Sequence, residues 1–237
     1  MEEKATRTSA KQRIIIGVIA LLMLGSFLAV YIGIVMGNQG NSTPKIDQNK
    51  VAELQKEYTA KQKEVDTETA KWSKKYFDDF KQFKSQVKSF NSSTANSDGI
   101  KTTDVRVGTG RTLEKSDKNY FAYYIGWCAD ESIFDSSFDD AKNPTSLKTP
   151  IDANIGLIEG WTRGVEGMKT GGVRVVSIPG EYAYGESKEI CGGKNSPLKF
   201  VIMALDKSEP LSTLSDELST LNMKLVYASQ GIEVPEN

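Results

Sequence analysis

The spacing of apolar residues changes once along this chain of 237 residues, and the change limits which folds it can adopt. Between about Val51 and Phe90 there is no Gly or Pro, and apolar residues recur mostly at steps of three, four or seven, which predicts one long amphipathic helix. After the loop-like stretch NSSTANSDG at 91–99, apolar residues occur in short alternating runs between Gly, Pro, Asp and Ser. We therefore expect an α+β protein with a mainly antiparallel β domain over residues 101–208.

A second amphipathic helix is predicted over residues 211–229, where leucines alternate at steps of three and four, with Thr213 and Asp216 as a capping pair at its start. Neither helix can bury its apolar stripe alone, so we expect the two to pack on each other or on the β domain. The aromatic half of the first helix, residues 72–90, leaves three possibilities open: docking on its own β domain, self-association as a coiled coil, or binding of an apolar client.

The N-terminal region resembles a membrane anchor. Residues 14–36, IIIGVIALLMLGSFLAVYIGIVM, are 23 uncharged residues, which as a helix extend about 34 Å and can cross a bilayer. Four basic residues precede this segment and none follows it before Lys45, so the positive-inside bias predicts a cytoplasmic tail at 1–13. The linker at 37–50 and everything after it should then be extracytoplasmic.

A cleaved signal peptide is the alternative interpretation of this segment. The apolar run is longer than the usual core of a signal peptide, and no small-x-small cleavage site follows it. We therefore expect an uncleaved signal-anchor and a single-pass membrane protein. The chain has no ER-retention ending, which favours a bacterial cell envelope.

Composition excludes several kinds of chemistry. The chain has no histidine, which removes imidazole acid–base catalysis, Ser-His and Cys-His nucleophiles, and every histidine-containing metal site. A formal charge of -1 provides no overall field that would attract nucleic acid. Cys128 and Cys191 form no C-x-x-C motif and have no histidine partners for a zinc site. We expect no metal, no cofactor and no nucleic-acid partner.

The β region carries six motifs, and the order and approximate spacing of these motifs are more specific than any one of them. They are VGTG at 107–110, YYIG at 123–126, IFDSS at 133–137, LIEGWTRGVEGMKTGG at 157–172, IPGEYAYG at 178–185 and LKFVIMAL at 198–205. This set resembles the FKBP family of peptidyl-prolyl cis/trans isomerases, the macrolide-binding immunophilins. The resemblance implies a twisted antiparallel sheet wrapped around one short helix, here at about Thr162 to Gly167.

The resemblance also implies a site for a proline ring, with six catalytic residues and four further residues that contact the substrate. The catalytic set is Tyr124, Phe134, Asp135, Trp161, Tyr184 and Phe200, and the substrate-contacting set is Ile151, Leu157, Ile158 and Ile190. In this assignment Phe134, Trp161 and Phe200 hold the ring. Tyr184 donates a hydrogen bond to a substrate carbonyl, and Asp135 provides local polarity. The alternative is that these aromatic residues only build the core.

The implied reaction suits a chain without histidine. An X-Pro bond resists rotation by about 18–20 kcal/mol because of amide resonance, and its isomerisation moves no proton and forms no covalent bond. An apolar site that fits the twisted proline better than either planar isomer lowers this barrier. The implied partners are proline-containing polypeptides and macrolides. The enzyme would assist protein folding at the membrane, and a weakly catalytic binding module or holdase chaperone is the alternative.

Two segments depart from the family pattern. Residues 141–156 have an altered spacing in which Leu147 or Ile151 replaces a pocket aromatic. Residues 186–197 differ from the Gly-Ile-Pro-Pro type tip of many family members, so Ile190 is only an approximate equivalent of the isoleucine at the rim of the pocket. These departures leave the client preference and the affinity for macrolides open. Cys191 lies in the second segment, 63 positions after Cys128. Buried free thiols are one interpretation, and a disulfide that holds this loop is the one we expect in an extracytoplasmic domain.

Overall fold

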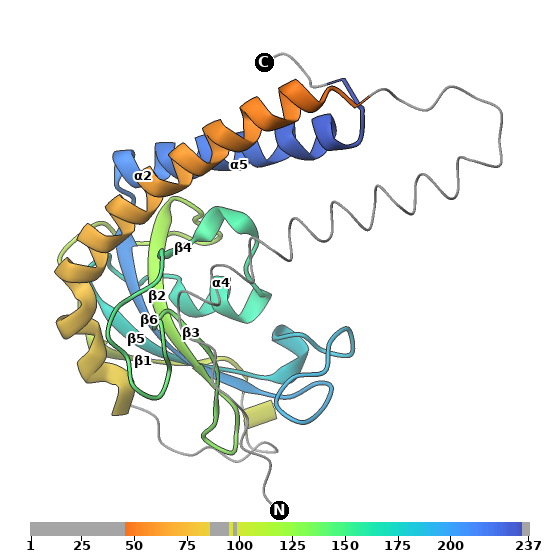
Figure 1. Ribbon diagram of the computed structural model, residues 1–237. Coiled ribbons are helices and arrows are strands. Elements are labelled where there is room, and N and C mark those ends of the chain that lie inside the picture. The colour runs from red at the N-terminus through yellow and green to blue at the C-terminus, as the bar shows by residue number, and fades with distance from the viewer. Residues whose placement is uncertain (1–45, 86–94, 97–98, 234–237) are drawn as a thin grey trace, which may run out of the picture. The chain divides into compact units, whose positions relative to one another are not determined.

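The computed structural model describes residues 46–85, 95–96 and 99–233 (Figure 1). The described residues form two compact units: those up to Glu64 together with those from Leu214 onward make one, and those within Val65–Thr213 make the other. The predicted membrane segment at 14–36 lies outside the described residues. Among the helices of the described ranges, none combines the length and the apolar character needed to cross a membrane.

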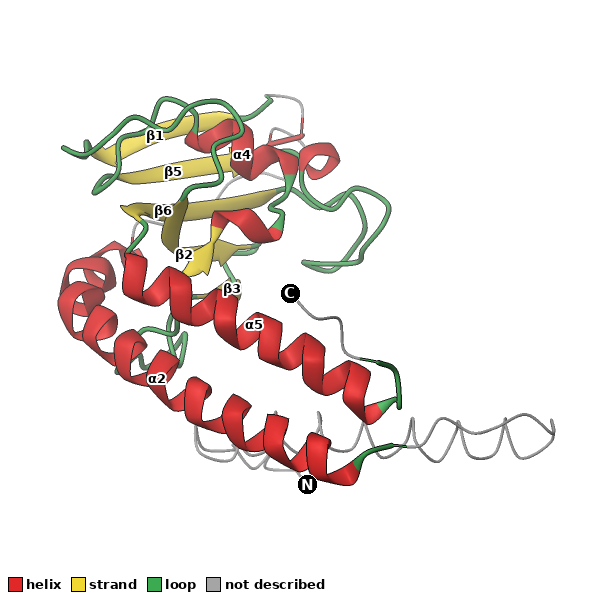
Figure 2. Ribbon diagram, turned by 90° about the horizontal axis from the view of Figure 1, so that it is seen from above, coloured by secondary structure: helices red, strands yellow, loops and turns green. Residues whose placement is uncertain are grey.

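The second unit contains one antiparallel sheet with the strand order β1-β5-β6-β2-β3 (Figure 2), and β4 pairs with β2 beside this path. This confirms the expected antiparallel sheet. The strands are β1 (Lys101–Arg106), β2 (Tyr120–Trp127), β3 (Ile133–Ser136), β4 (Ile151–Asp152), β5 (Val173–Ile178) and β6 (Leu198–Asp206).

The central strands β2 and β6 are covered on both faces. Tyr120 and Ala122 of β2 belong to one core cluster, and the residues that alternate with them, Phe121 and Tyr123, are equally buried but point to the opposite face. Strands covered on both sides need apolar residues at nearly every position, which explains the run YFAYYIGW.

The short helix α4 (Glu159–Val165) covers the first of these faces. It begins three residues before the predicted Thr162 and ends two before Gly167, so the predicted bounds are wrong. Ile158 is still extended, with φ −58° and ψ 149°, and the helix ends where Glu166 leaves helical dihedrals and Gly167 takes φ +74°. A Cβ at Gly160 would lie 2.1 Å from the Ile178 side chain, so only glycine lets α4 approach β5 this closely.

The opposite face is covered by the second half of α2 (Gln48–Lys81), which the 3-10 turn η1 (Gln82–Ser85) extends. The Trp72 and Phe121 rings meet edge to face with centroids 5.5 Å apart, and the Phe80 ring lies 6.0 Å from that of Tyr123. The Ser73 hydroxyl accepts a 2.8 Å hydrogen bond from the buried N–H of Leu147. Of the three possibilities left open for the aromatic half of this helix, the structure therefore shows docking on its own β domain.

The first half of α2 packs against α5 (Glu209–Ser229) within the first unit (Figure 2). Leu54 lies in a small buried cluster with Leu225 and Ala228, and Lys61 pairs with Glu217 at 2.7 Å. The prediction that the two amphipathic helices pack on each other or on the β domain is confirmed.

The observed helix ends differ from the predicted ones for local reasons. The side chain of Asp47 accepts hydrogen bonds from the N–H groups of Asn49 and Lys50, so α2 begins before Val51. Residues 86–90, the end of the predicted helix, lie outside the described residues. Helix α5 begins at Glu209 rather than residue 211, since Pro210 suits a first turn. Thr213 and Asp216 therefore lie inside the helix, and their assignment as its cap is wrong.

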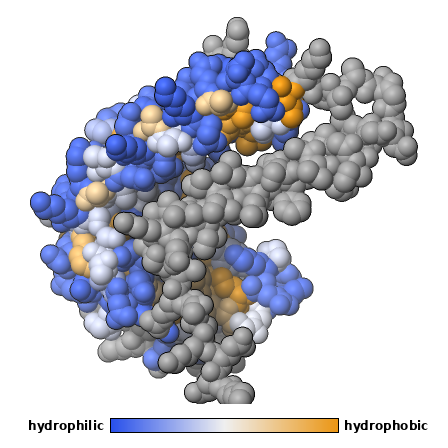
Figure 3. Space-filling view, viewed as in Figure 1, coloured by the Kyte–Doolittle hydropathy of each residue, from blue (hydrophilic) through white to orange (hydrophobic). Residues whose placement is uncertain are grey.

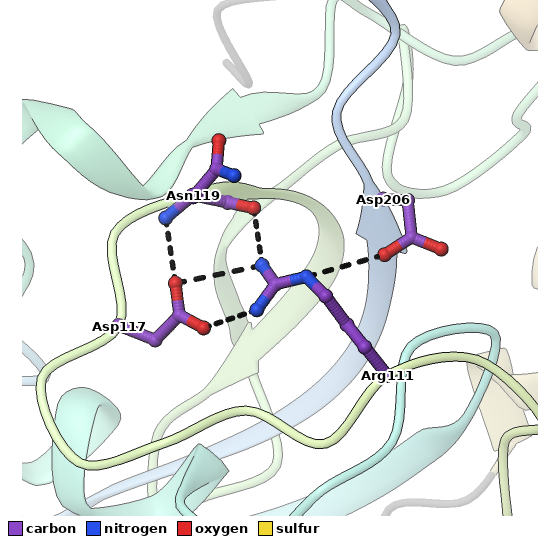
Figure 4. Close-up of polar contacts among 4 residues, drawn as sticks. All are labelled: Arg111, Asp117, Asn119 and Asp206. Atoms are coloured by element: carbon purple, nitrogen blue, oxygen red, sulfur yellow. Dashed lines mark hydrogen bonds and ion pairs between the residues drawn. The ribbon is translucent and has the colours of Figure 1, made fainter.

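A polar network holds the 111–119 loop beside the end of β6 (Figure 4). The guanidinium of Arg111 donates to the carboxylate of Asp117 and to the carbonyl of Asn119, and its Nε lies 3.5 Å from Asp206. Asp117 also accepts a 2.7 Å hydrogen bond from the Asn119 N–H. The hydrogen bond from Arg111 lowers the pKa of Asp117, although burial opposes the shift.

We expect Asp117→Asn to lower the free energy of unfolding by about 1 kcal/mol at neutral pH. The pKa of Asp117 is lower in the folded than in the unfolded chain, so the carboxylate stabilises the fold fully above about pH 4, and this contribution is lost as the pH falls through the folded-state pKa. Urea unfolding of both proteins between pH 2.5 and 7 measures the difference. A difference that stays constant over this range would show that the carboxylate charge is not the cause.

Candidate active site

Four aromatic rings from four different elements meet on the face of the sheet that carries α4. The ring of Trp161, from α4, lies 5.2 Å from that of Phe200 on β6 and 5.4 Å from that of Tyr124 on β2. The ring of Phe134 on β3 meets Phe200 edge to face at 5.6 Å. Trp161 and Phe200 are buried, whereas Tyr124 and Phe134 are only partly buried. The cluster therefore has a closed floor and an accessible side.

A hydrogen bond to a buried residue that the sequence analysis did not identify holds Trp161 in place. Its Nε1 donates a 3.0 Å hydrogen bond to the hydroxyl of Tyr120, which is fully buried. Burial raises the pKa of Tyr120 to about 12, so the hydroxyl stays neutral at physiological pH. Tyr120 precedes Tyr124 by four positions on β2, and strand alternation could have placed it on this face.

Gly126 is a second residue whose role only the structure reveals. A Cβ at this position would lie 2.7 Å from the ring of Phe134 and 2.9 Å from that of Phe200. No side chain fits there without moving one of the two rings. The glycine of the YYIG motif thus provides the space in which these rings meet.

Asp135 lies exposed beside the cluster and is held by it. The hydroxyl of Tyr124 donates a 2.5 Å hydrogen bond to Asp135 Oδ2, and the backbone N–H of Ser136 donates to Oδ1 at 2.8 Å. Burial, assisted by the hydrogen bond to this carboxylate, raises the pKa of Tyr124 well above its usual value. Tyr124 therefore stays a neutral donor that orients Asp135.

The five other predicted site residues pack against the larger hydrophobic core that contains Trp161 and Phe200. All five are partly buried apolar or aromatic residues: Ile151, Leu157, Ile158, Tyr184 and Ile190. Tyr182, which the sequence analysis did not single out, packs there too, with the Arg163 guanidinium 4.7 Å from its ring centre. Leu147 does not belong to the site, because it is buried beside Phe138 and hydrogen-bonded to Ser73.

A disulfide holds the altered 186–197 loop beside the cluster. The predicted bond between Cys128 and Cys191 is confirmed, with Cα atoms 5.3 Å apart. Ile190 and Gly193 exchange backbone hydrogen bonds of 3.0 and 3.2 Å across a turn in which Cys191 and Gly192 both have positive φ, +55° and +83°. Cys128 is buried next to the end of β2, so the bond ties the turn to the sheet.

In the part of the chain that the structure describes, no group of three or more Cys, Asp or Glu side chains is arranged to hold a metal ion. The residues that meet at the candidate site are aromatic and aliphatic, with one carboxylate. Such a site can bind an apolar ring and orient a polar backbone, and it contains no nucleophile paired with a base.

Comparisons with known proteins assign the domain. A family model described as FKBP-type peptidyl-prolyl cis-trans isomerase matches residues 110–205. An FK506-binding protein of Neisseria meningitidis serogroup B is 34% identical over 90 residues, which cover 37% of this chain and 75% of that protein. The chain belongs to the FKBP-type peptidyl-prolyl cis-trans isomerase family.

Other similarities concern the same FKBP domain. FK506-binding protein 4 of Dictyostelium discoideum is 39% identical over 92 residues, which make up 38% of this chain but only 22% of that longer protein. The crystal structure of AtFKBP13 is similar over 47% of this chain and 94% of that chain, with 28% identity and a TM-score of 0.36. Helices α2 and α5 and strand β1 lie outside the matched residues 110–205.

Proposed function

We propose that this protein is a single-pass membrane protein whose FKBP domain accelerates prolyl isomerisation in extracytoplasmic polypeptides and so assists their folding. The convergence of Phe134, Trp161 and Phe200 beside the hydrogen-bonded pair of Tyr124 and Asp135 carries the proposal for the site. The uncharged segment at 14–36 and the basic residues before it support the anchor and the orientation.

The aromatic cluster acts on the amide by its shape and its low polarity. A proline ring held against Trp161 carries its preceding amide to the accessible side of the cluster, near Phe134. Removing water from this amide weakens the charge-separated resonance form that gives the C–N bond its double-bond character. Tyr184 donates a hydrogen bond to a substrate carbonyl, and Asp135, fixed by Tyr124, supplies the polar edge. The aromatic lining also suits macrolides, which we propose as competing ligands.

A holdase that binds clients through the aromatic half of α2 is disfavoured. Trp72, Phe80 and Phe83 are buried, at 8%, 0% and 6% exposure, and so are not available to a client. The isomerase needs no such surface. We therefore do not assign a second function to this helix.

The proposal is tested with the full chain reconstituted in lipid vesicles. We expect it to accelerate the refolding of a proline-limited protein added outside, and Trp161→Leu to lose most of this acceleration because the floor of the site and its hydrogen bond to Tyr120 disappear. Circular dichroism checks that the variant is folded. A folded wild type without acceleration would refute the activity, and protease access to residues 1–13 from the side of the FKBP domain would refute the single membrane span.

A further inference from the structure

The first unit has little apolar core of its own. Its described part pairs the first half of α2 with α5, and the buried residues between them are Leu54, Leu225 and Ala228, with Val51 and Leu221 packed against them. Two helices that share so short a seam leave most of their remaining surface exposed to solvent. The side chains on that surface therefore indicate which environment the unit contacts.

Four exposed apolar residues gather at one end of this unit. Met223 is 50% exposed, Val226 41%, Ile232 47% and Ile46 36%, and we call these four the terminal patch. Only three other large hydrophobic residues in the described ranges are exposed, and all three lie in the second unit. The space-filling view shows hydrophobic residues at this end, in a surface that is mostly hydrophilic (Figure 3).

The two residues of the terminal patch that belong to α5 lie on the outer side of this helix. Met223 and Val226 are three positions apart and share one face, which is roughly opposite the face of Leu225 and Ala228 that packs on α2. The next residue of this outer face is Gln230, so the last turns expose no charged side chain between the two apolar residues and the helix end. This arrangement suits an apolar environment better than water.

Backbone caps fix both ends that carry the terminal patch. After α5, the N–H of Ile232 donates to the carbonyl of Tyr227 at 3.0 Å, and the N–H of Gly231 donates to that of Ala228 at 3.1 Å, with Gly231 at φ +66°. These two hydrogen bonds form a Schellman motif, which holds Ile232 at the helix end. Asp47 caps α2 directly after Ile46. The patch is thus a fixed surface.

The terminal patch lies at the end of the unit where the proposed anchor enters. Leu54 packs beside Leu225 and Ala228, so the antiparallel pair brings the start of α2 and the end of α5 to the same end. Ile46 follows Met36, the last residue of the uncharged segment, by ten positions, which even a fully extended chain spans in at most about 35 Å. This end of the unit must therefore stay close to the bilayer.

We propose that the terminal patch inserts into the interfacial region of the lipid bilayer that holds the anchor. This inference rests on the proposed membrane anchor. Burial of Met223, Val226 and Ile232 among acyl chains removes their exposed area from water. Lys224, next to Met223, can keep its ammonium group at the level of the headgroup phosphates. The occupant is a lipid surface, and no lipid of a particular headgroup is required.

The test uses the full chain, reconstituted in phosphatidylcholine vesicles, with a nitroxide attached to Val226→Cys or Met223→Cys. Both native cysteines are bonded to each other, so the label reacts with the introduced thiol. Asp216→Cys is the matched control, since it is exposed on the same helix about 15 Å before Val226. We expect the ratio of oxygen to nickel-complex accessibility to be at least fivefold higher at 223 and 226 than at 216.

Each other outcome has a separate meaning. If the chain resists a carbonate wash but all three labels are equally accessible to the nickel complex, the terminal patch is not in lipid and this inference fails alone. If the labels at 223 and 226 show spin–spin broadening that disappears on dilution with unlabelled chain, a second copy covers the patch and the inference is also overturned. Release of the chain by carbonate would refute the anchor, and this inference with it.

Discussion

Replacing Phe134 by Ala is expected to lower kcat/KM for prolyl isomerisation about 10- to 100-fold. The Phe134 ring is partly buried and meets Phe200 edge to face, on the accessible side of the aromatic cluster. In the variant, the substrate proline loses its apolar contact with this ring while the preceding amide bond rotates. Burial of a Phe side chain contributes about 1.5–3 kcal/mol of apolar stabilisation. Each 1.4 kcal/mol lost from the transition state lowers the rate tenfold.

Phe77→Ala is the matched control. Phe77 is also a partly buried phenylalanine, and its ring meets that of Phe138 edge to face, with an interplanar angle of 86° against 85° for the pair of Phe134 and Phe200. It lies on the α2 side of the sheet, away from the aromatic cluster. We expect the two variants to lose similar amounts of stability and only Phe134→Ala to lose activity. Equal activities in a protease-coupled proline peptide assay would show that Phe134 does not contact the substrate.

Removing the disulfide with the double variant Cys128→Ser and Cys191→Ser is expected to lower the free energy of unfolding by about 4 kcal/mol. The bond joins residues 63 positions apart, and a loop of that length restricts the unfolded chain strongly. Urea unfolding followed by tryptophan fluorescence measures the change. All three tryptophans, Trp72, Trp127 and Trp161, lie in the unit that contains the bond, so the fluorescence reports on that unit.

Dithiothreitol supplies the control for this prediction. It should lower the stability of the wild type toward that of the double variant and leave the variant unchanged. Reduction should also loosen the turn at Ile190 and Gly193, because the covalent link between Cys191 and the sheet is then lost. If wild type and variant unfold at the same urea concentration without reductant, the bond contributes nothing to stability.

The sequence was informative wherever a residue's role depends on its neighbours along the chain. Alternating runs predicted the antiparallel sheet, and the ordered motifs placed Phe134, Trp161 and Phe200 in one site, where the structure brings their rings together. Spacing of apolar residues predicted both amphipathic helices. The pairing of Cys128 with Cys191 was predicted as well, from the expected compartment and the position of Cys191 in the altered loop.

Element ends were less predictable, because they depend on single backbone contacts. The capping assignment of Thr213 and Asp216 failed because a Ser/Thr with an acidic residue three positions later also occurs inside helices, and Pro210 allows α5 to begin earlier. Helix α4 begins before Thr162 because Gly160 lets it pack closely on β5. Neither effect follows from the sequence without the position of the facing strand.

The sequence by itself determined which faces are apolar, where the chain turns and which residue types form the site, since these follow from periodicity and from local backbone preferences. Only the tertiary structure decided what each apolar face contacts. It places the aromatic half of α2 on the sheet rather than on a client, excludes Leu147 from the site and supports Trp161 with Tyr120. The physical reason is that burial depends on the shape and area of the partner surface, and residues distant in sequence provide that surface.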